Sequence, residues 1–284
     1  MSREPTSPRA LLVRYGLRPK QAFGQSFLAD AGIARKIAEL STADPGGTVV
    51  EIGAGLGALT RPLLERAAKV IAIERDRDLV PALAQELEDE VAEKRLEILE
   101  ADAKKVDYAA LLDGAARPRA IAGNLPYQLT GPLLRLTVEL SPAFDRAVYM
   151  VQLEVAARLA AKPSEADYGA LTVFVGAALR VERKMVVRRG AFYPQPNVDS
   201  AVVVLTPLDP PLARETDEFR AVVKAAFAQR RKTLRNAWRA VAGLSAEALA
   251  LAAERAEIDL DLRGETLEVG QFSRMAEQIR AARP

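Results

Sequence analysis

An alternation of strand-like and helix-like segments constrains this chain more than any other feature of its sequence. This order predicts parallel βαβ units, and hence an α/β fold built on a doubly wound sheet. The predicted strands are residues 48–52, 69–74, 96–99, 119–123 and 147–151, and the predicted helices are residues 56–66, 76–90, 108–112 and 132–140. Residues 171–187 and 200–205 are predicted to be further strands, with a buried strand over the apolar run 170–179. Since no long helix separates them, we expect an antiparallel edge on the parallel sheet.

A proline-rich stretch, TPLDPPL over residues 206–212, divides the chain. Every segment beyond it has helical periodicity, and Trp238 is expected to anchor the core there. We therefore expect a flexible amino-terminal tail over residues 1–17, an α/β domain over residues 18–206 and a small all-helical domain over residues 207–284.

The composition excludes several kinds of chemistry. The 284 residues include no cysteine and no histidine, which removes thiolate nucleophiles, disulfides and the usual general base near neutral pH. We expect no metal site. No apolar run is long enough to cross a bilayer and none has the form of a signal peptide, so we expect a cytoplasmic protein with no membrane partner. Because the net charge is only +2, a nucleic-acid surface would need local clusters of cations.

The turn after the first predicted strand is rich in glycine. It has the sequence EIGAGLG over residues 51–57, and Gly53 and Gly55 would let a ligand approach the backbone closely. Glu74 ends the second strand, where an acid suits ribose hydroxyls, and Asp102 follows the third, where it could accept from an adenine amine. The glycines alone also fit a dinucleotide-binding dehydrogenase. The three strand ends together favour a nucleoside cofactor.

The fourth strand runs into Asn124-Leu125-Pro126-Tyr127. Methylation of an exocyclic amine requires its lone pair to be aimed at the methyl donor, and on adenine that lone pair is delocalised into the ring. The Asn124 side-chain oxygen and the Leu125 carbonyl could accept the two N–H groups and favour a tetrahedral nitrogen. Pro126 fixes the turn without a competing N–H, and Tyr127 offers a face for a flipped base. This chemistry works mostly by positioning and needs no histidine.

Four segments in this order resemble the motifs of the ribosomal RNA adenine N6,N6-dimethyltransferases, in particular the small-subunit (kasugamycin-sensitivity) branch. They are KQAFGQSFL over residues 20–28, NLPY over 124–127, FYPQPNVDSAV over 192–202 and FAQRRKTLRN over 227–236. The resemblance extends from about residue 18 to at least residue 238. It implies a Rossmann-like class I methyltransferase sheet that binds S-adenosylmethionine.

The resemblance also implies roles for particular residues. Ser26 and Leu28 would contact the cofactor together with Gly53, Gly55, Glu74, Asp102 and Asn124, and Phe192 would stack on the target adenine opposite Tyr127. Many relatives carry asparagine where this chain has Ser26. The implied reaction is dimethylation of two adjacent adenosines in the 3′-terminal hairpin loop of small-subunit (16S) ribosomal RNA, by a monomer acting on a partly assembled subunit.

Three alternatives remain open: a large-subunit adenine methylase that confers antibiotic resistance, a nicotinamide-dependent dehydrogenase, and a non-catalytic relative that kept the fold. VDSAV over residues 198–202 and the RRKTLRN stretch favour the small-subunit branch.

Clusters of cations suggest where RNA would bind. Arg231, Arg235 and Arg239 are spaced to share one face of a single helix, with Lys232 beside them. Arg188 and Arg189 belong to a second cluster that flanks the late motif, and Arg14, Arg18 and Lys20 form a third. Such clusters bind phosphates even in a chain of nearly neutral total charge.

Overall fold

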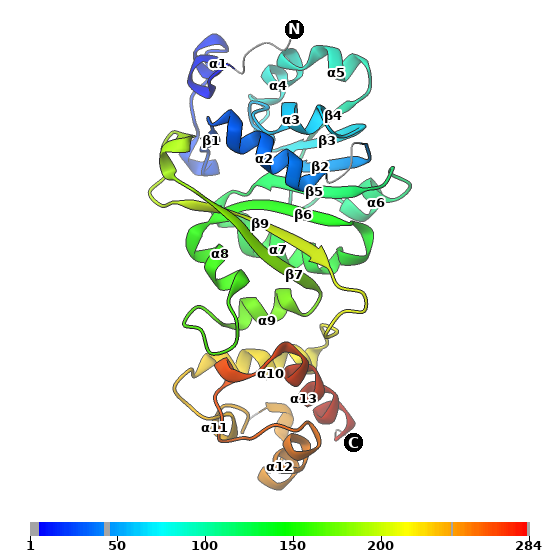
Figure 1. Cartoon of the computed structure of the whole chain (residues 1–284), viewed down its shortest axis with the longest axis vertical. Helices are drawn as coiled ribbons and strands as arrows, with labels where there is room; N and C mark the ends of the chain where they lie inside the picture. Colours follow the sequence, from blue (N-terminus) through cyan, green and yellow to red (C-terminus); the bar gives the residue numbers. More distant parts are fainter. Residues whose placement is uncertain (1–5, 43–45, 240, 283–284) are drawn as a thin grey trace. The chain divides into compact units, whose positions relative to one another are not determined.

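The computed structural model describes residues 6–42, 46–239 and 241–282 (Figure 1). The contacts divide it into two compact units. The first holds the described residues up to Ala156 together with Glu182–Pro207. The second holds Ala157–Val181 and the described residues from Leu208 onward.

The centre of the first unit is a sheet of seven strands among the described residues, in the order β4-β3-β2-β5-β6-β9-β7. Its strands are β2 (Thr48–Ile52), β3 (Lys69–Glu74), β4 (Leu96–Glu100), β5 (Arg119–Asn124), β6 (Arg146–Gln152), β7 (Leu179–Val187) and β9 (Ser200–Pro207). Adjacent strands are parallel along the series β4-β3-β2-β5-β6, and β9 runs antiparallel to β6. The predicted parallel sheet with an antiparallel edge is confirmed.

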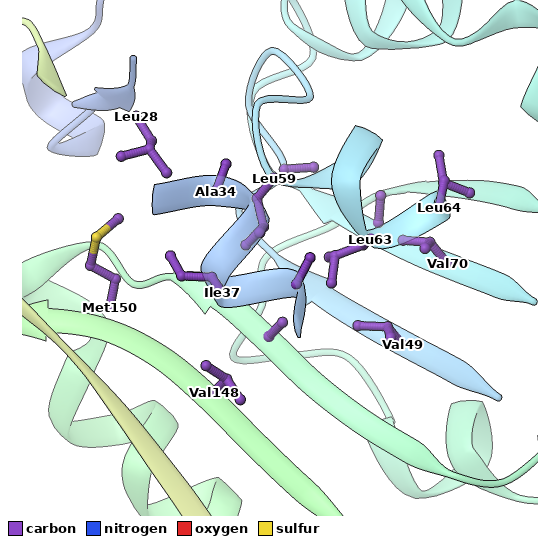
Figure 2. Close-up of a cluster of buried hydrophobic side chains, with 14 of the residues drawn as sticks. Leu28, Ala34, Ile37, Val49, Leu59, Leu63, Leu64, Val70, Val148 and Met150 are labelled. Carbon is purple, nitrogen blue, oxygen red and sulfur yellow. The ribbon is translucent and has the colours of Figure 1, made fainter. Parts of the chain in front are cut away.

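Alternation along β6 explains why helices cover both faces of the sheet. Val148 and Met150 enter a buried cluster with Ile37 of α2 (Ala31–Ser41), which Figure 2 shows together with side chains of α3 (Thr60–Leu64). Tyr149 points to the opposite face, where its hydroxyl lies 2.8 Å from Thr137 Oγ1 on α7 (Thr130–Glu139). The remaining helices of the first unit are α1 (Pro8–Arg14), α4 (Val80–Glu86), α5 (Glu88–Ala92) and α6 (Tyr108–Leu112), and α8 (Leu153–Ala160) crosses from the first unit into the second.

The expectation of a flexible tail over residues 1–17 is wrong for residues 8–14, which form α1, while residues 1–5 lie outside the described part of the chain. Ser7 caps this helix by accepting from the Ala10 amide, and Pro8 suits its first turn. Leu11 and Leu12 are buried with Phe27 and other apolar side chains of the first unit. The helix is therefore held by packing that a short, Ser- and Pro-rich sequence does not reveal.

The predicted buried strand over residues 170–179 is also wrong, because α9 (Ala170–Gly176) is a helix and only the segment that follows it is β7. A short apolar run does not distinguish a strand from a buried helix by its periodicity. Here the Gly169 amide donates to Thr172 Oγ1 at 3.1 Å, which caps the helix start. Phe174 then packs edge-on against Phe219, with ring centroids 6.0 Å apart.

The second unit is built from helices: α9, α10 (Asp217–Ala228), α11 (Leu234–Ala237), α12 (Ala246–Arg255) and α13 (Val269–Ala281). Trp238 is fully buried in its core, as predicted, and its indole N–H donates to the Val222 carbonyl at 2.9 Å. The expected boundary at residue 207 leaves residues 157–181 in the α/β domain, whereas the contacts place them in this unit. One reason is that the Tyr168 hydroxyl donates to the Leu267 carbonyl at 2.7 Å.

Gly123 in β5 is required by the close approach of β2. A Cβ added there would lie 2.6 Å from the Ile52 carbonyl oxygen, a backbone atom that cannot easily move. We expect Gly123→Ala to lower the free energy of unfolding by about 1–3 kcal/mol in urea titrations, as overpacking does. Gly131→Ala in α7 is the matched control, since its Cβ would meet nothing within 4 Å. Equal stability of the two variants would contradict this account of the strand pair.

Candidate active site

A pocket lies at the carboxyl ends of β2, β3 and β5, where ligands bind in a doubly wound sheet. The predicted site residues that line it are Ser26, Leu28, Gly53, Gly55, Glu74, Asn124, Leu125, Pro126, Tyr127 and Phe192. Asp102 is not among the lining residues, although Ala101 and Ala103 are. The Asp102 carboxylate instead accepts from the Lys104 amide at 3.1 Å. Its role toward a cofactor stays a prediction.

The glycine-rich turn is shaped by left-handed backbone conformations. Gly53 has φ 75° and Gly55 has φ 58°, which residues with a side chain rarely adopt. A Cβ at Gly55 would also come within 3.2 Å of the Phe27 ring. The turn therefore leaves its backbone bare on the side of the pocket.

Glu74 holds this turn to the end of β3. Its Oε2 accepts from the Gly55 amide and its Oε1 from the Asp76 amide, both at 2.8 Å. Burial raises the pKa of Glu74 above its ordinary value, although backbone N–H groups, among them those of Asp76 and Gly55, oppose the rise. A carboxylate oxygen can accept more than one hydrogen bond, so both oxygens retain capacity for ribose hydroxyls.

Asn124 has its side-chain amide oriented by the amino-terminal segment. Its Nδ2 donates to the Ser26 carbonyl at 3.0 Å, which leaves Oδ1 as the acceptor within the pocket. The Leu125 amide donates to the Met150 carbonyl at 3.1 Å. That bond fixes the backbone that carries the Leu125 carbonyl, so the two predicted acceptors sit on a rigid strand end.

Tyr127 of the NLPY motif and Phe192 of the FYPQPNVDSAV motif both line the pocket, although they lie far apart in the sequence. The Tyr127 hydroxyl lies 3.2 Å from the buried Ser200 Oγ, which restrains its ring. Phe192 belongs to β8 (Phe192–Tyr193), which pairs with β1 (Phe27–Leu28). The structure thus brings the two predicted stacking rings to one pocket.

Comparison with known proteins agrees with this geometry. The family described as ribosomal RNA adenine dimethylase matches residues 16–281. The Ribosomal RNA small subunit methyltransferase A of Anaeromyxobacter sp. (strain K) is 45% identical over 277 residues, which cover 94% of this chain and 95% of the relative.

This chain belongs to the ribosomal RNA adenine dimethylase family.

Two solved structures resemble the fold. A dimethyladenosine transferase from Plasmodium falciparum has a TM-score of 0.71 and 25% identity, covering 88% of this chain and 95% of that one. The 23S rRNA methyltransferase ErmE has a TM-score of 0.66 and 26% identity, covering 89% and 99%. The Rossmann-like class I methyltransferase fold is therefore confirmed for this dimethylase.

The dimethylase pocket fits S-adenosylmethionine, by two observations. The bare backbone at Gly55 beside the buried Glu74 carboxylate suits a nucleoside, as argued above. Glu51 also lines the pocket, and its Oε2 is buried without a hydrogen-bond partner among the described residues. An unpartnered buried carboxyl oxygen is consistent with a hydrogen-bonding group on a bound molecule. The glycine motif includes Glu51, but we assigned it no role from the sequence; an acid within an otherwise apolar strand was the available signal.

The segment from Lys20 to Leu28 covers one side of the pocket, and the sequence did not predict how it is held. Lys20 Nζ contacts Asp76 Oδ1 at 2.5 Å, and Gln25 Nε2 donates to Asp76 Oδ2 at 2.7 Å. Burial tends to raise the pKa of Asp76, but these two partners outweigh it and the pKa is lowered. Two cations lie over the Phe23 ring, with Lys20 Nζ 5.5 Å and the Arg75 guanidinium 5.0 Å from its centroid.

The predicted cationic stripe on one helix is wrong. Helix α10 ends at Ala228, so Arg231 lies in the following turn, Arg235 on the short α11 and Arg239 beyond it. The chain does not continue α10 here: the Lys232 amide donates to the Gln229 carbonyl in a turn, and at the start of α11 the Arg235 amide donates to the Leu260 carbonyl, both at 2.8 Å. All three arginines and Lys232 are nevertheless exposed.

Arg188 and Arg189 occupy an exposed loop before β8 and line a polar hollow with Gln195 and Asn197. Asp199 organises this loop, since its carboxylate accepts from Arg188 at 2.7 Å and from the Arg189 amide at 3.0 Å. These bonds hold the pKa of Asp199 below its usual value. Each guanidinium keeps further N–H donors for a phosphate.

Within residues 6–42, 46–239 and 241–282, no group of three or more acidic side chains is arranged to hold a metal ion. No helix in that part of the chain is both long and apolar enough to cross a membrane.

Replacing Glu74 should weaken binding of S-adenosylmethionine. We expect Glu74→Ala to raise the Kd by an amount equivalent to about 1–3 kcal/mol, as for a lost charge-assisted hydrogen bond. Calorimetry measures the change, and circular dichroism checks the fold. Glu97→Ala is the matched control, because this acid of β4 is exposed and pairs with Lys69 at 2.6 Å. Unaltered affinity in a folded Glu74 variant would exclude the ribose role.

Glu51 should make stability depend on pH. Burial, with the nearby charge of Glu74, raises the pKa of Glu51 to about 8 from 4.5. The folded state thus keeps a proton that the unfolded state loses above pH 4.5, so the contribution to stability is present at low pH and is lost as the pH rises toward 8. The difference in the free energy of unfolding, Glu51→Gln minus wild type, should therefore be larger at pH 8 than at pH 5 by roughly 3–4 kcal/mol in favour of the variant. Urea titrations of both proteins at the two pH values measure this; a constant difference would contradict it.

Proposed function

We propose that this chain transfers methyl groups from S-adenosylmethionine to N6 of two adjacent adenosines in the 3′-terminal hairpin loop of small-subunit ribosomal RNA. The observation that carries the proposal is the pair of acceptors at the end of β5, where Asn124 is held by Ser26. The relative that is 45% identical bears the name Ribosomal RNA small subunit methyltransferase A, which supports the choice of subunit.

S-adenosylmethionine supplies an electrophilic methyl group when bound. Glu74 would hold its ribose hydroxyls, Gly53 and Gly55 would admit it to the backbone, and Leu28 would contact it from the amino-terminal segment. Asp102 would accept from its adenine amine, although its carboxylate already accepts from the Lys104 amide.

The target amine is activated by position. Asn124 Oδ1 and the Leu125 carbonyl accept the two N6–H groups and draw the nitrogen toward a tetrahedral shape, which exposes its lone pair. As the nitrogen is alkylated it becomes acidic, so its proton can leave to solvent without a strong base. Fixed acceptors that require no reorganisation are an efficient form of catalysis.

Tyr127 and Phe192 would enclose the flipped base between them. Unpaired loop bases are extruded at a cost of only a few kcal/mol, which makes a hairpin loop a suitable target. After the first transfer the amine carries one methyl group and one N–H, and it must rotate before the second transfer. The pocket beside Asn124 must therefore have room for a methyl group.

The exposed cations would bind the RNA backbone. In the first unit these are Arg188 and Arg189, which flank the segment that carries Phe192. In the second unit they are Arg231, Lys232, Arg235 and Arg239. Arg235 also donates to Asp261 Oδ1 at 3.1 Å. Because this pair is exposed and weak, a phosphate can replace Asp261 as the partner of Arg235. Folded RNA is recognised largely through its backbone and its single-stranded features.

We further propose that the protein acts as a cytoplasmic monomer on a partly assembled small subunit. Methylation of large-subunit RNA is the alternative, and the similarity of the fold to the 23S rRNA methyltransferase ErmE supports it.

The position of the methyl groups tests the proposal. Small-subunit particles lacking the modification, incubated with the protein and S-adenosylmethionine, should gain four methyl groups on two neighbouring adenosines. Mass spectrometry of nuclease fragments locates them. Asn124→Ala should lower kcat by about 10²–10³-fold, as for a lost preorganised group at a reacting centre, while the fold and RNA binding persist. Methylation of large-subunit RNA instead would overturn the assignment, and near-normal turnover of the variant would overturn the mechanism.

A further inference from the structure

Ser26 lies where three motifs of the site meet. Its carbonyl oxygen accepts from Asn124 Nδ2 at 3.0 Å, and its hydroxyl donates to the Pro194 carbonyl at 2.7 Å. One residue of the amino-terminal segment is therefore bound both to the catalytic motif and to the late motif, which are far apart in the sequence.

The hydroxyl of Ser26 has a single proton to donate. In this structure the proton is directed at the Pro194 carbonyl. A cofactor carboxylate would need the same proton, because a carboxylate accepts hydrogen bonds and does not donate them. The two uses compete, and the observed one joins Ser26 to the side of the pocket that would hold the base.

The neighbouring residues strengthen this connection. Phe27 pairs with Tyr193 and Leu28 with Phe192 in the two-stranded β1–β8 sheet. The position of Phe192 at the pocket thus depends on the strand that directly follows Ser26. The Ser26–Pro194 bond extends the pairing of the two strands by one more contact, on the side toward Asn124.

We propose that Ser26 is a positioning residue for the target adenine rather than a ligand of the cofactor. Its carbonyl sets the orientation of the Asn124 amide, and its hydroxyl sets the place of the Phe192–Pro194 segment relative to that amide. The Phe192 ring, which stacks on the base, and Asn124 Oδ1, which accepts from N6–H, are thereby held at a fixed distance and orientation relative to each other. This inference rests on the proposed function, because it assigns the base side of the same pocket.

The test compares Ser26→Ala, which removes the hydroxyl alone, with Ser26→Thr, which keeps it. For the alanine variant we expect kcat on unmethylated small-subunit particles to fall roughly 3- to 10-fold, as for one lost hydrogen bond. The share of monomethyladenosine should rise, because the second transfer has only one N–H left to guide it. The Kd of S-adenosylmethionine by calorimetry should stay within about twofold of wild type, and the threonine variant should restore kcat and the product ratio.

Two results would overturn the inference. One is a Kd for S-adenosylmethionine that rises fivefold or more in the alanine variant with kcat unchanged, which would make Ser26 a cofactor ligand. The other is a variant with wild-type kcat and product ratio. Wild-type protein on the same particles is the reference, so absence of its activity would count against the proposed function alone, whereas calorimetry needs no RNA and reports on Ser26 in either case.

Discussion

The buried carboxylate of Glu74 is the interaction on which the pocket depends. It lies at the end of β3 and accepts from the Gly55 amide of the turn after β2, so it joins two parallel strand ends at the point where a ligand would sit. Removing a carboxylate from water is unfavourable unless hydrogen bonds compensate it. Here two backbone amides compensate it in part, and the same geometry keeps the glycine backbone open toward the cofactor.

The base side of the site is built on different elements. Asn124 and Leu125 come from the end of β5, and Phe192 comes from β8, which precedes the antiparallel strand β9. The reaction that we propose requires acceptors and flat surfaces at fixed places and no group that exchanges protons near neutral pH. A chain without histidine or cysteine can meet that requirement.

Much of this arrangement could be predicted from the sequence, because it follows from local patterns. Strand ends, glycine turns and the Asn-Leu-Pro-Tyr motif place their residues relative to a sheet whose topology has few solutions. The errors arose where distant contacts decide the local structure. Helix α1 depends on a buried cluster, α9 depends on packing against α10, and the start of α11 depends on the carbonyl groups of Leu260 and Leu262. Likewise, no local pattern reveals that Lys20 meets Asp76.

Three of the bonds that join the motifs around the base share one property: their acceptors are main-chain carbonyls. Asn124 binds the carbonyl of Ser26, Ser26 binds that of Pro194, and the Leu125 amide binds that of Met150. Every type of residue supplies such an oxygen, so only the donor in each pair must keep a particular side chain, and a main-chain amide requires none. As an acceptor, each of these residues is therefore constrained by the path of its backbone and not by its side chain.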